Sequence, residues 1–134
     1  MINEREAVER LVAICPGFAP HWLRYLGSWE GTPSGEYNDV GALAEWLVGC
    51  MAIGELDCFS MLFEEVESLL VGASTEVRNV LVIGLLEDIQ YISIDRRVDP
   101  DIALRFLGPE SRKEWFSLVR IVHRDWPGQS REDG

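Results

Sequence analysis

Few side chains in this sequence could do chemistry, and those few do not form a catalytic or metal-binding pattern. Histidine occurs only at His21 and His123, and neither has a carboxylate or a second histidine at the spacing of an HExxH or ExxH metal site. The glycines occur singly, and the sequence has no GxSxG, GxGxxG or Walker-type motif. We therefore expect no catalytic residue, no metal and no cofactor, and we do not expect an enzyme.

The three cysteines, Cys15, Cys50 and Cys58, are odd in number and form no CxxC pair. This pattern argues against a disulfide framework, so we expect buried, reduced thiols. Cys58 lies at the edge of the apolar face of a predicted helix and has no adjacent histidine or lysine to activate it. A structural thiol is therefore a better interpretation than a nucleophile.

Asp88 departs from its local pattern, because it lies between apolar residues such as Leu85 and Ile92. Burying a carboxylate without hydrogen-bond donors is costly. In a structural interpretation, Asp88 accepts from a helix N-terminus, an indole N–H or an arginine such as Arg112. In a functional interpretation, it is a general acid or base with a raised pKa. The structural interpretation is favoured, because catalysis needs a second convergent group and none is visible.

Acidic residues dominate the middle of the chain. The formal net charge is -11, and no lysine or arginine occurs between Arg24 and Arg78. A field of this sign repels nucleic acid and anionic membranes and attracts a basic protein. The alternative is a solvated surface that serves solubility alone. Acidic residues in this interval are Glu30, Glu36, Asp39, Glu45, Glu55, Asp57, Glu64, Glu65, Glu67 and Glu76.

Length and composition predict one folded domain over residues 1–134. The chain has 134 residues, 47% of them hydrophobic, with five tryptophans and five phenylalanines, which is far from a disordered composition. The longest apolar run, 80–86, is too short to span a bilayer, and the first residues are charged where a signal peptide is apolar. We expect a cytoplasmic protein with a polar, frayed tail from about residue 128.

Apolar residues recur at helical spacing, which predicts an all-α, irregular bundle of about six or seven helices arranged in antiparallel hairpins. Its centre is a helix over about 74–95 that is apolar on nearly every face, with Ser74 as its N-cap. At 100° per residue, Val80 and Ile83 lie on one side of this helix and Leu81 on the other, so both sides need packing partners. Gly84 in its interior predicts close approach of another helix or of an aromatic ring.

The remaining helices are predicted from caps, breakers and apolar spacing. The second begins near Pro20 and carries large aromatic side chains such as Trp22 and Trp29, and the third opens at Asn38 or Asp39. The fourth, about 56–71, is the most amphipathic and should form a hairpin with the central helix. Its expected core residues are Leu56, Phe59, Leu62, Phe63, Val66, Leu69 and Leu70, and its expected outer residues are Asp57, Ser60, Met61, Glu64, Glu65, Glu67 and Ser68.

Two segments, TEVRNVLVIGLLEDIQ at 75–90 and FLGPESRKEW at 106–115, follow this acidic amphipathic helix. Together they resemble a family of small helical bacterial proteins, the immunity proteins of polymorphic toxin systems, including contact-dependent growth inhibition. The resemblance covers roughly residues 36–126 and rests on pattern. It implies a non-enzymatic, cytoplasmic antidote that binds one toxin domain and blocks its active site or substrate path. Its scaffold residues here are Arg78, Asn79, Gly84, Glu87, Asp88, Gly108 and Pro109.

The resemblance and the acidic segment together give the leading hypothesis, an immunity protein that neutralises a basic toxin domain, such as a nuclease. The alternative is an acidic helical adaptor or chaperone that binds another protein. A small enzyme is disfavoured because no nucleophile, base or metal cluster converges. The expected partner-binding residues are Glu45, Asp57, Met61, Glu64, Glu65, Glu67 and Ser68.

Overall fold

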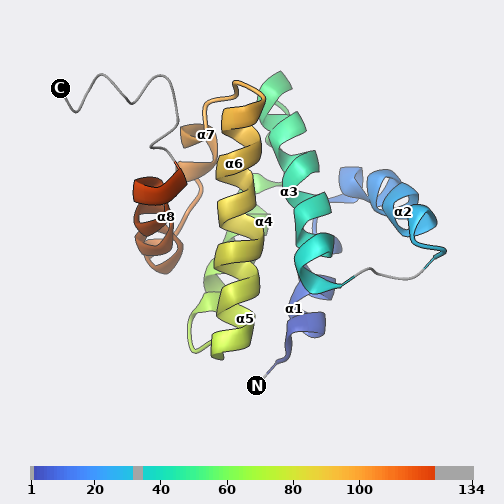
Figure 1. Cartoon of the computed structure of the whole chain (residues 1–134), viewed down its shortest axis with the longest axis horizontal. Helices are drawn as coiled ribbons and strands as arrows, with labels where there is room; N and C mark the ends of the chain where they lie inside the picture. Colours follow the sequence, from blue (N-terminus) through green and yellow to red (C-terminus); the bar gives the residue numbers. More distant parts are fainter. Residues whose placement is uncertain (1, 32–34, 123–134) are drawn as a thin grey trace.

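A computed structural model describes residues 2–31 and 35–122, and every regular element within these ranges is helical (Figure 1), which confirms the all-α prediction. None of the described helices is both long and apolar enough to cross a bilayer. The predicted tail and His123 lie outside the described residues. In chain order the elements are α1 (Glu4–Val12), η1 (Pro16–Phe18), α2 (Ala19–Ser28), α3 (Glu36–Ile53), α4 (Phe59–Leu70), α5 (Thr75–Asn79), η2 (Val80–Leu86), α6 (Glu87–Asp95), α7 (Asp101–Leu104) and α8 (Pro109–Val122).

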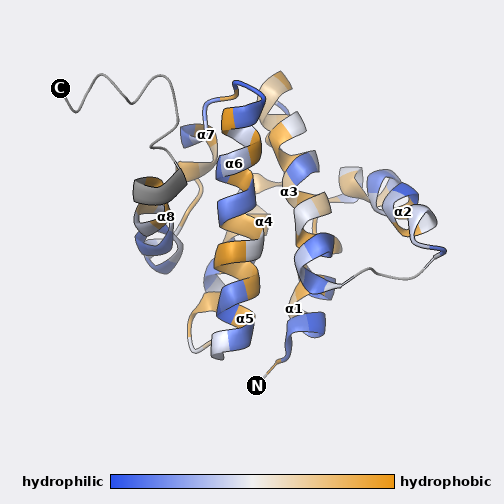
Figure 2. Cartoon of the chain, viewed as in Figure 1, coloured by the Kyte–Doolittle hydropathy of each residue, from blue (hydrophilic) through white to orange (hydrophobic). Residues whose placement is uncertain are grey.

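The elements α5, η2 and α6 form one continuous central helix, as predicted, and hydrophobic residues recur along it (Figure 2). The side chain of Ser74 accepts from the Val77 N–H at 3.2 Å and caps its start. In the middle the helix is a π-helix, where the Glu87 N–H donates to the carbonyl of Val82, five residues earlier. Ile83, predicted to need a packing partner, is 47% exposed, whereas Val80 on the same predicted side is buried.

Helix α3 packs along the central helix at Gly84, which is buried. A Cβ atom on Gly84 would lie 2.8 Å from Cγ2 of Val40 and 3.2 Å from Cδ1 of Tyr37, which is too close for a carbon atom. The predicted close approach at Gly84 is therefore confirmed, and the approaching element is α3.

The start of α3 is fixed by a buried carboxylate whose role the sequence did not reveal. The predicted start at Asn38 or Asp39 is wrong, because the helix begins at Glu36 after Gly35. Asp39 therefore lies inside its first turn, and it is fully buried. One oxygen of Asp39 accepts from Arg5 of α1 at 2.6 Å, and the other accepts from the hydroxyl of Tyr25 of α2 at 2.7 Å. Because the buried charge is both paired and hydrogen-bonded, Asp39 joins α1, α2 and α3.

Helix α2 lies at one side of the bundle and buries none of its residues (Figure 1). Its aromatic side chains were expected to supply a large apolar area, and Trp22 is partly buried against the core, next to Phe18 of η1. The ring centroids of Trp22 and Tyr25 are 5.3 Å apart, and those of Phe18 and Trp22 are 5.9 Å apart. On the outer side, Leu23 is 67% exposed.

The expectation of three reduced thiols is wrong for two of them. Cys15, before η1, forms a disulfide with Cys58, before α4, and their Cα atoms are 5.5 Å apart. Cys50 is free and buried. The pairing follows from the fold, because α1 packs on α4 and brings together two residues that are 43 positions apart. Sequence spacing alone cannot detect such a pair.

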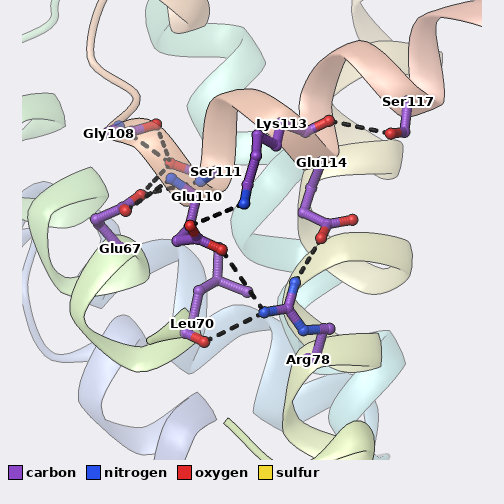
Figure 3. A network of polar contacts seen from close by, with 9 residues as sticks. All are labelled: Glu67, Leu70, Arg78, Gly108, Glu110, Ser111, Lys113, Glu114 and Ser117. Carbon is purple, nitrogen blue, oxygen red and sulfur yellow. Dashed lines mark hydrogen bonds and ion pairs between the residues drawn. The ribbon is translucent and has the colours of Figure 1, made fainter. Parts of the chain in front are cut away.

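Helix α4 begins at Phe59 rather than near residue 56, so Leu56, predicted for its core face, lies before it and is only partly buried. The other predicted core residues are all buried: Phe59, Leu62, Phe63, Val66, Leu69 and Leu70. Glu67 on its other face was predicted to project into solvent, and this is wrong. The carboxylate of Glu67 accepts from the N–H of Glu110 at 2.8 Å, the N–H of Ser111 at 3.0 Å and the Ser111 hydroxyl at 2.8 Å (Figure 3). It therefore caps the first turn of α8, whose N–H groups have no partner within the helix.

The surroundings of Glu67 favour this contact in several ways. Burial alone would raise the pKa of Glu67, but the hydrogen bonds from Ser111 and Glu110 outweigh it and hold the pKa below its ordinary value. A Cβ atom on Gly108 would lie 2.6 Å from Cδ of Glu67, so only glycine fits there. Nearby, Arg78 of α5 forms ion pairs with Glu110 and Glu114 of α8 (Figure 3). These contacts fasten α8 to the hairpin of α4 and α5.

The Glu67→Gln variant should lower the free energy of unfolding by about 1–2 kcal/mol, because an amide replaces a carboxylate that accepts three hydrogen bonds. Glu64→Gln, on the exposed side of the same helix, is the matched control and should change it by less than about 0.5 kcal/mol. Since the pKa of Glu67 is lowered in the folded state, its contribution is present near neutral pH and disappears as the pH falls through that pKa. Urea unfolding at several pH values measures both effects, and equal losses for the two variants would contradict the capping role.

Replacing Gly84 by leucine should destabilise the protein by about 1–3 kcal/mol, because the new side chain would force α3 away from the central helix. Gly49→Ala is the control, since a Cβ atom on Gly49 meets nothing within 4 Å. That change should stabilise by up to about 1 kcal/mol through helix propensity alone. Thermal unfolding compares them, and a raised midpoint for Gly84→Leu would show that the contact with α3 is not tight.

Candidate functional site

The predicted partner-binding residues are divided by the structure into separate environments. Four of them are exposed, and we call them the α4 face: Met61, Glu64 and Ser68 on α4, and Asp57 in the turn just before it. Met61, near its centre, is 60% exposed. Neither Asp57 nor Glu64 forms an ion pair with another described residue. The α4 face therefore combines an exposed apolar side chain with uncompensated negative charge.

The other three predicted residues do not belong to this surface. Glu67 caps α8, as described above. Glu65 is partly buried and lies 3.7 Å from Arg10 of α1, which offsets some of its charge. Glu45 is on α3 and lies 3.5 Å from Arg96. The lack of basic residues between 24 and 78 in the sequence thus overstates the local field, because the fold brings in arginines from outside that interval.

A second candidate site, which sequence reasoning did not identify, is a groove between α2, α3 and α6. It is open to solvent and has a volume of about 730 Å³, within the usual range for ligand sites. Its aromatic wall includes Trp29 and Tyr37, each 49% exposed. Charged and small side chains complete the lining. Those used below are His21, Arg24, Gly41, Glu45 and Asp88.

Asp88 lies in this groove without the hydrogen-bond donor that the structural interpretation required. No described residue donates to it or forms an ion pair with it. Arg112, the suggested donor, instead hydrogen-bonds to the carbonyl of Leu107 at 3.2 Å. Burial raises the pKa of Asp88 to about 6, and the neighbouring charge of Glu87 adds to the effect. The predicted pairing of Asp88 is therefore wrong.

Some residues of the groove stood out in the sequence, but the sequence did not show that they lie together in the fold. Asp88 stood out as a polar residue in an apolar pattern, and Gly41 was one of several small residues on the third helix. The aromatic side chains of α2 were expected only to supply a large apolar area, because their hydrophobicity does not reveal that α2 lies at the side of the bundle. Within the described ranges, no group of three histidine, cysteine or acidic side chains gathers in a way that could hold a metal ion.

Comparisons with known proteins place the chain in a family. Searches of curated proteins and of solved structures found no match. A family model described as "Domain of unknown function (DUF7674)" matches residues 8–123 and so spans most of the chain, including both candidate sites. The chain therefore belongs to this family, the DUF7674 domain of unknown function.

Proposed function

We propose that this protein is an immunity protein that binds a cognate bacterial toxin domain in the cytoplasm and blocks its active site or substrate path. The observation that carries the proposal is the α4 face. Met61 and Glu64 are exposed on a helix whose other side is buried in the core, and Asp57 is exposed in the turn just before that helix. The resemblance of segments 75–90 and 106–115 to immunity proteins suggests the kind of partner, a bacterial toxin domain. The contact surface proposed here is smaller than the predicted one.

The chemistry of the α4 face favours a basic protein partner. Unpaired carboxylates attract cationic groups and speed association, and those that become desolvated against arginine or lysine also slow dissociation. Met61 can adapt its shape to an apolar pocket, which is how methionine serves many binding surfaces. An apolar centre with charged neighbours is the usual arrangement of an interface that depends on a few strong contacts.

The support behind the face is rigid, which suits an inhibitor. The opposite side of α4 is buried in the core, and Glu67 fixes its second half to α8. A surface that is already ordered loses little conformational freedom on binding. A blocking protein benefits from this, because less of its interaction free energy with the toxin is offset by ordering of the binding surface.

Reversing both charges of the α4 face, with Asp57→Lys and Glu64→Lys, should leave the fold intact and weaken toxin binding by about 10- to 100-fold. Glu67 must be kept, because its replacement would disturb α8. The control is Glu76→Lys with Asp95→Lys, which makes the same change of net charge at exposed positions elsewhere. Calorimetry with the toxin domain encoded by the neighbouring gene, at low and high salt, measures the effect.

The two possible results are distinct. If the proposal is right, the α4 variant loses affinity and its cells lose protection, while the control keeps both. Equal affinities for the wild type and the α4 variant would place the interface elsewhere. Failure of the wild-type protein to co-purify with that toxin domain would contradict immunity itself and would favour the acidic adaptor.

A further inference from the structure

We propose that the groove between α2, α3 and α6 is a second binding site, which holds the guanidinium group of an arginine presented by a partner protein, with Asp88 as its counter-ion. The site lies on elements other than α4 and rests on its own geometry. It would therefore stand even if toxin neutralisation through the α4 face proved wrong.

The carboxylate of Asp88 is the first reason. It is partly withdrawn from water, yet no described residue donates to it or pairs with it. Gly41 of α3 lies opposite, and a Cβ atom there would come within 3.1 Å of Oδ2 of Asp88. The absence of a side chain at Gly41 keeps this oxygen open to the groove. An incoming cation with hydrogen-bond donors would satisfy a carboxylate that the fold itself leaves without a partner.

The aromatic wall is the second reason. Tyr37 and Trp29 line the same groove and each keeps about half of its surface exposed, at 49%. Aromatic rings attract cations over their faces, and the flat, weakly hydrated guanidinium group stacks on them better than the ammonium group of lysine does. A groove lined by both a carboxylate and aromatic rings thus favours arginine over lysine.

The charges that face Asp88 fit a cationic ligand. Glu87 beside it on α6 and Glu45 on α3 are negative, although Glu45 already pairs with Arg96. His21 and Arg24 line the same groove from α2, and Arg24 is exposed there. Arg24 carries the same charge as the proposed ligand, so it should weaken binding. Replacing Arg24 therefore tests directly whether the groove prefers a positively charged ligand.

The test uses a capped Gly-Arg-Gly peptide, with Gly-citrulline-Gly as its uncharged counterpart of nearly the same shape. Titration followed by amide NMR should shift the signals of Tyr37, Gly41 and Asp88 with the arginine peptide, and citrulline should bind at least about tenfold more weakly. Because Asp88 has a pKa of about 6, binding of the arginine peptide should weaken as the pH falls below that value and the carboxylate takes up a proton. Shifts that are equal for the two peptides, or absent near these residues, would overturn the proposal.

Three variants complete the test. Asp88→Asn should bind the arginine peptide at least about tenfold more weakly, with an unfolding midpoint that is unchanged or raised, because burial disfavours the charge that it removes. Arg24→Ala should bind more tightly, and Asp95→Asn, which is exposed and outside the groove, should bind like the wild type. Full affinity in Asp88→Asn, or weaker binding in Arg24→Ala, would show that the groove is not an arginine site.

Discussion

The close packing of α3 on the central helix at Gly84 determines most of what is distinctive in this structure. The absence of a side chain at Gly84 lets Val40 approach, and the neighbours of Val40 take their positions from that contact. Asp39, next to Val40, lies in the interior, where its carboxylate needs partners. It accepts hydrogen bonds from Arg5 of α1 and Tyr25 of α2, and these bonds link both helices to α3.

The same contact creates the groove. One turn beyond Gly84, Asp88 meets Gly41, which is one residue after Val40 on α3. Tyr37 lies beside Gly84 and forms part of the aromatic wall. The packing of α3 on the central helix therefore forms one side of the groove, and α2 forms the other.

Two carboxylates show why local sequence predicts burial poorly for single polar residues. Glu67 looked exposed from helical periodicity, yet its partners come from α8, more than 40 residues further along the chain, and their hydrogen bonds lower its pKa. Asp88 was expected to have a partner, yet the fold provides none among the described residues, and burial raises its pKa. The difference lies in contacts between distant segments, which periodicity does not encode.

Local signals, by contrast, predicted the helices well. Ser74 caps the central helix, as its position before the apolar run predicted. The buried face of α4 also followed from its period. The π-helical turn, the Cys15–Cys58 disulfide and the peripheral position of α2 depend on tertiary packing, and none has a local signature.

The methyl group of Met61 offers the most direct measurement of the proposed interface. The chain has three methionines, and in a protein labelled at the methionine methyl groups Met61 reports on the α4 face, while Met51, only 4% exposed, reports on the core. If the α4 face binds the toxin, adding the toxin domain should shift or broaden the Met61 signal and leave that of Met51 in place. A complex that forms while the Met61 signal stays unchanged would contradict the account.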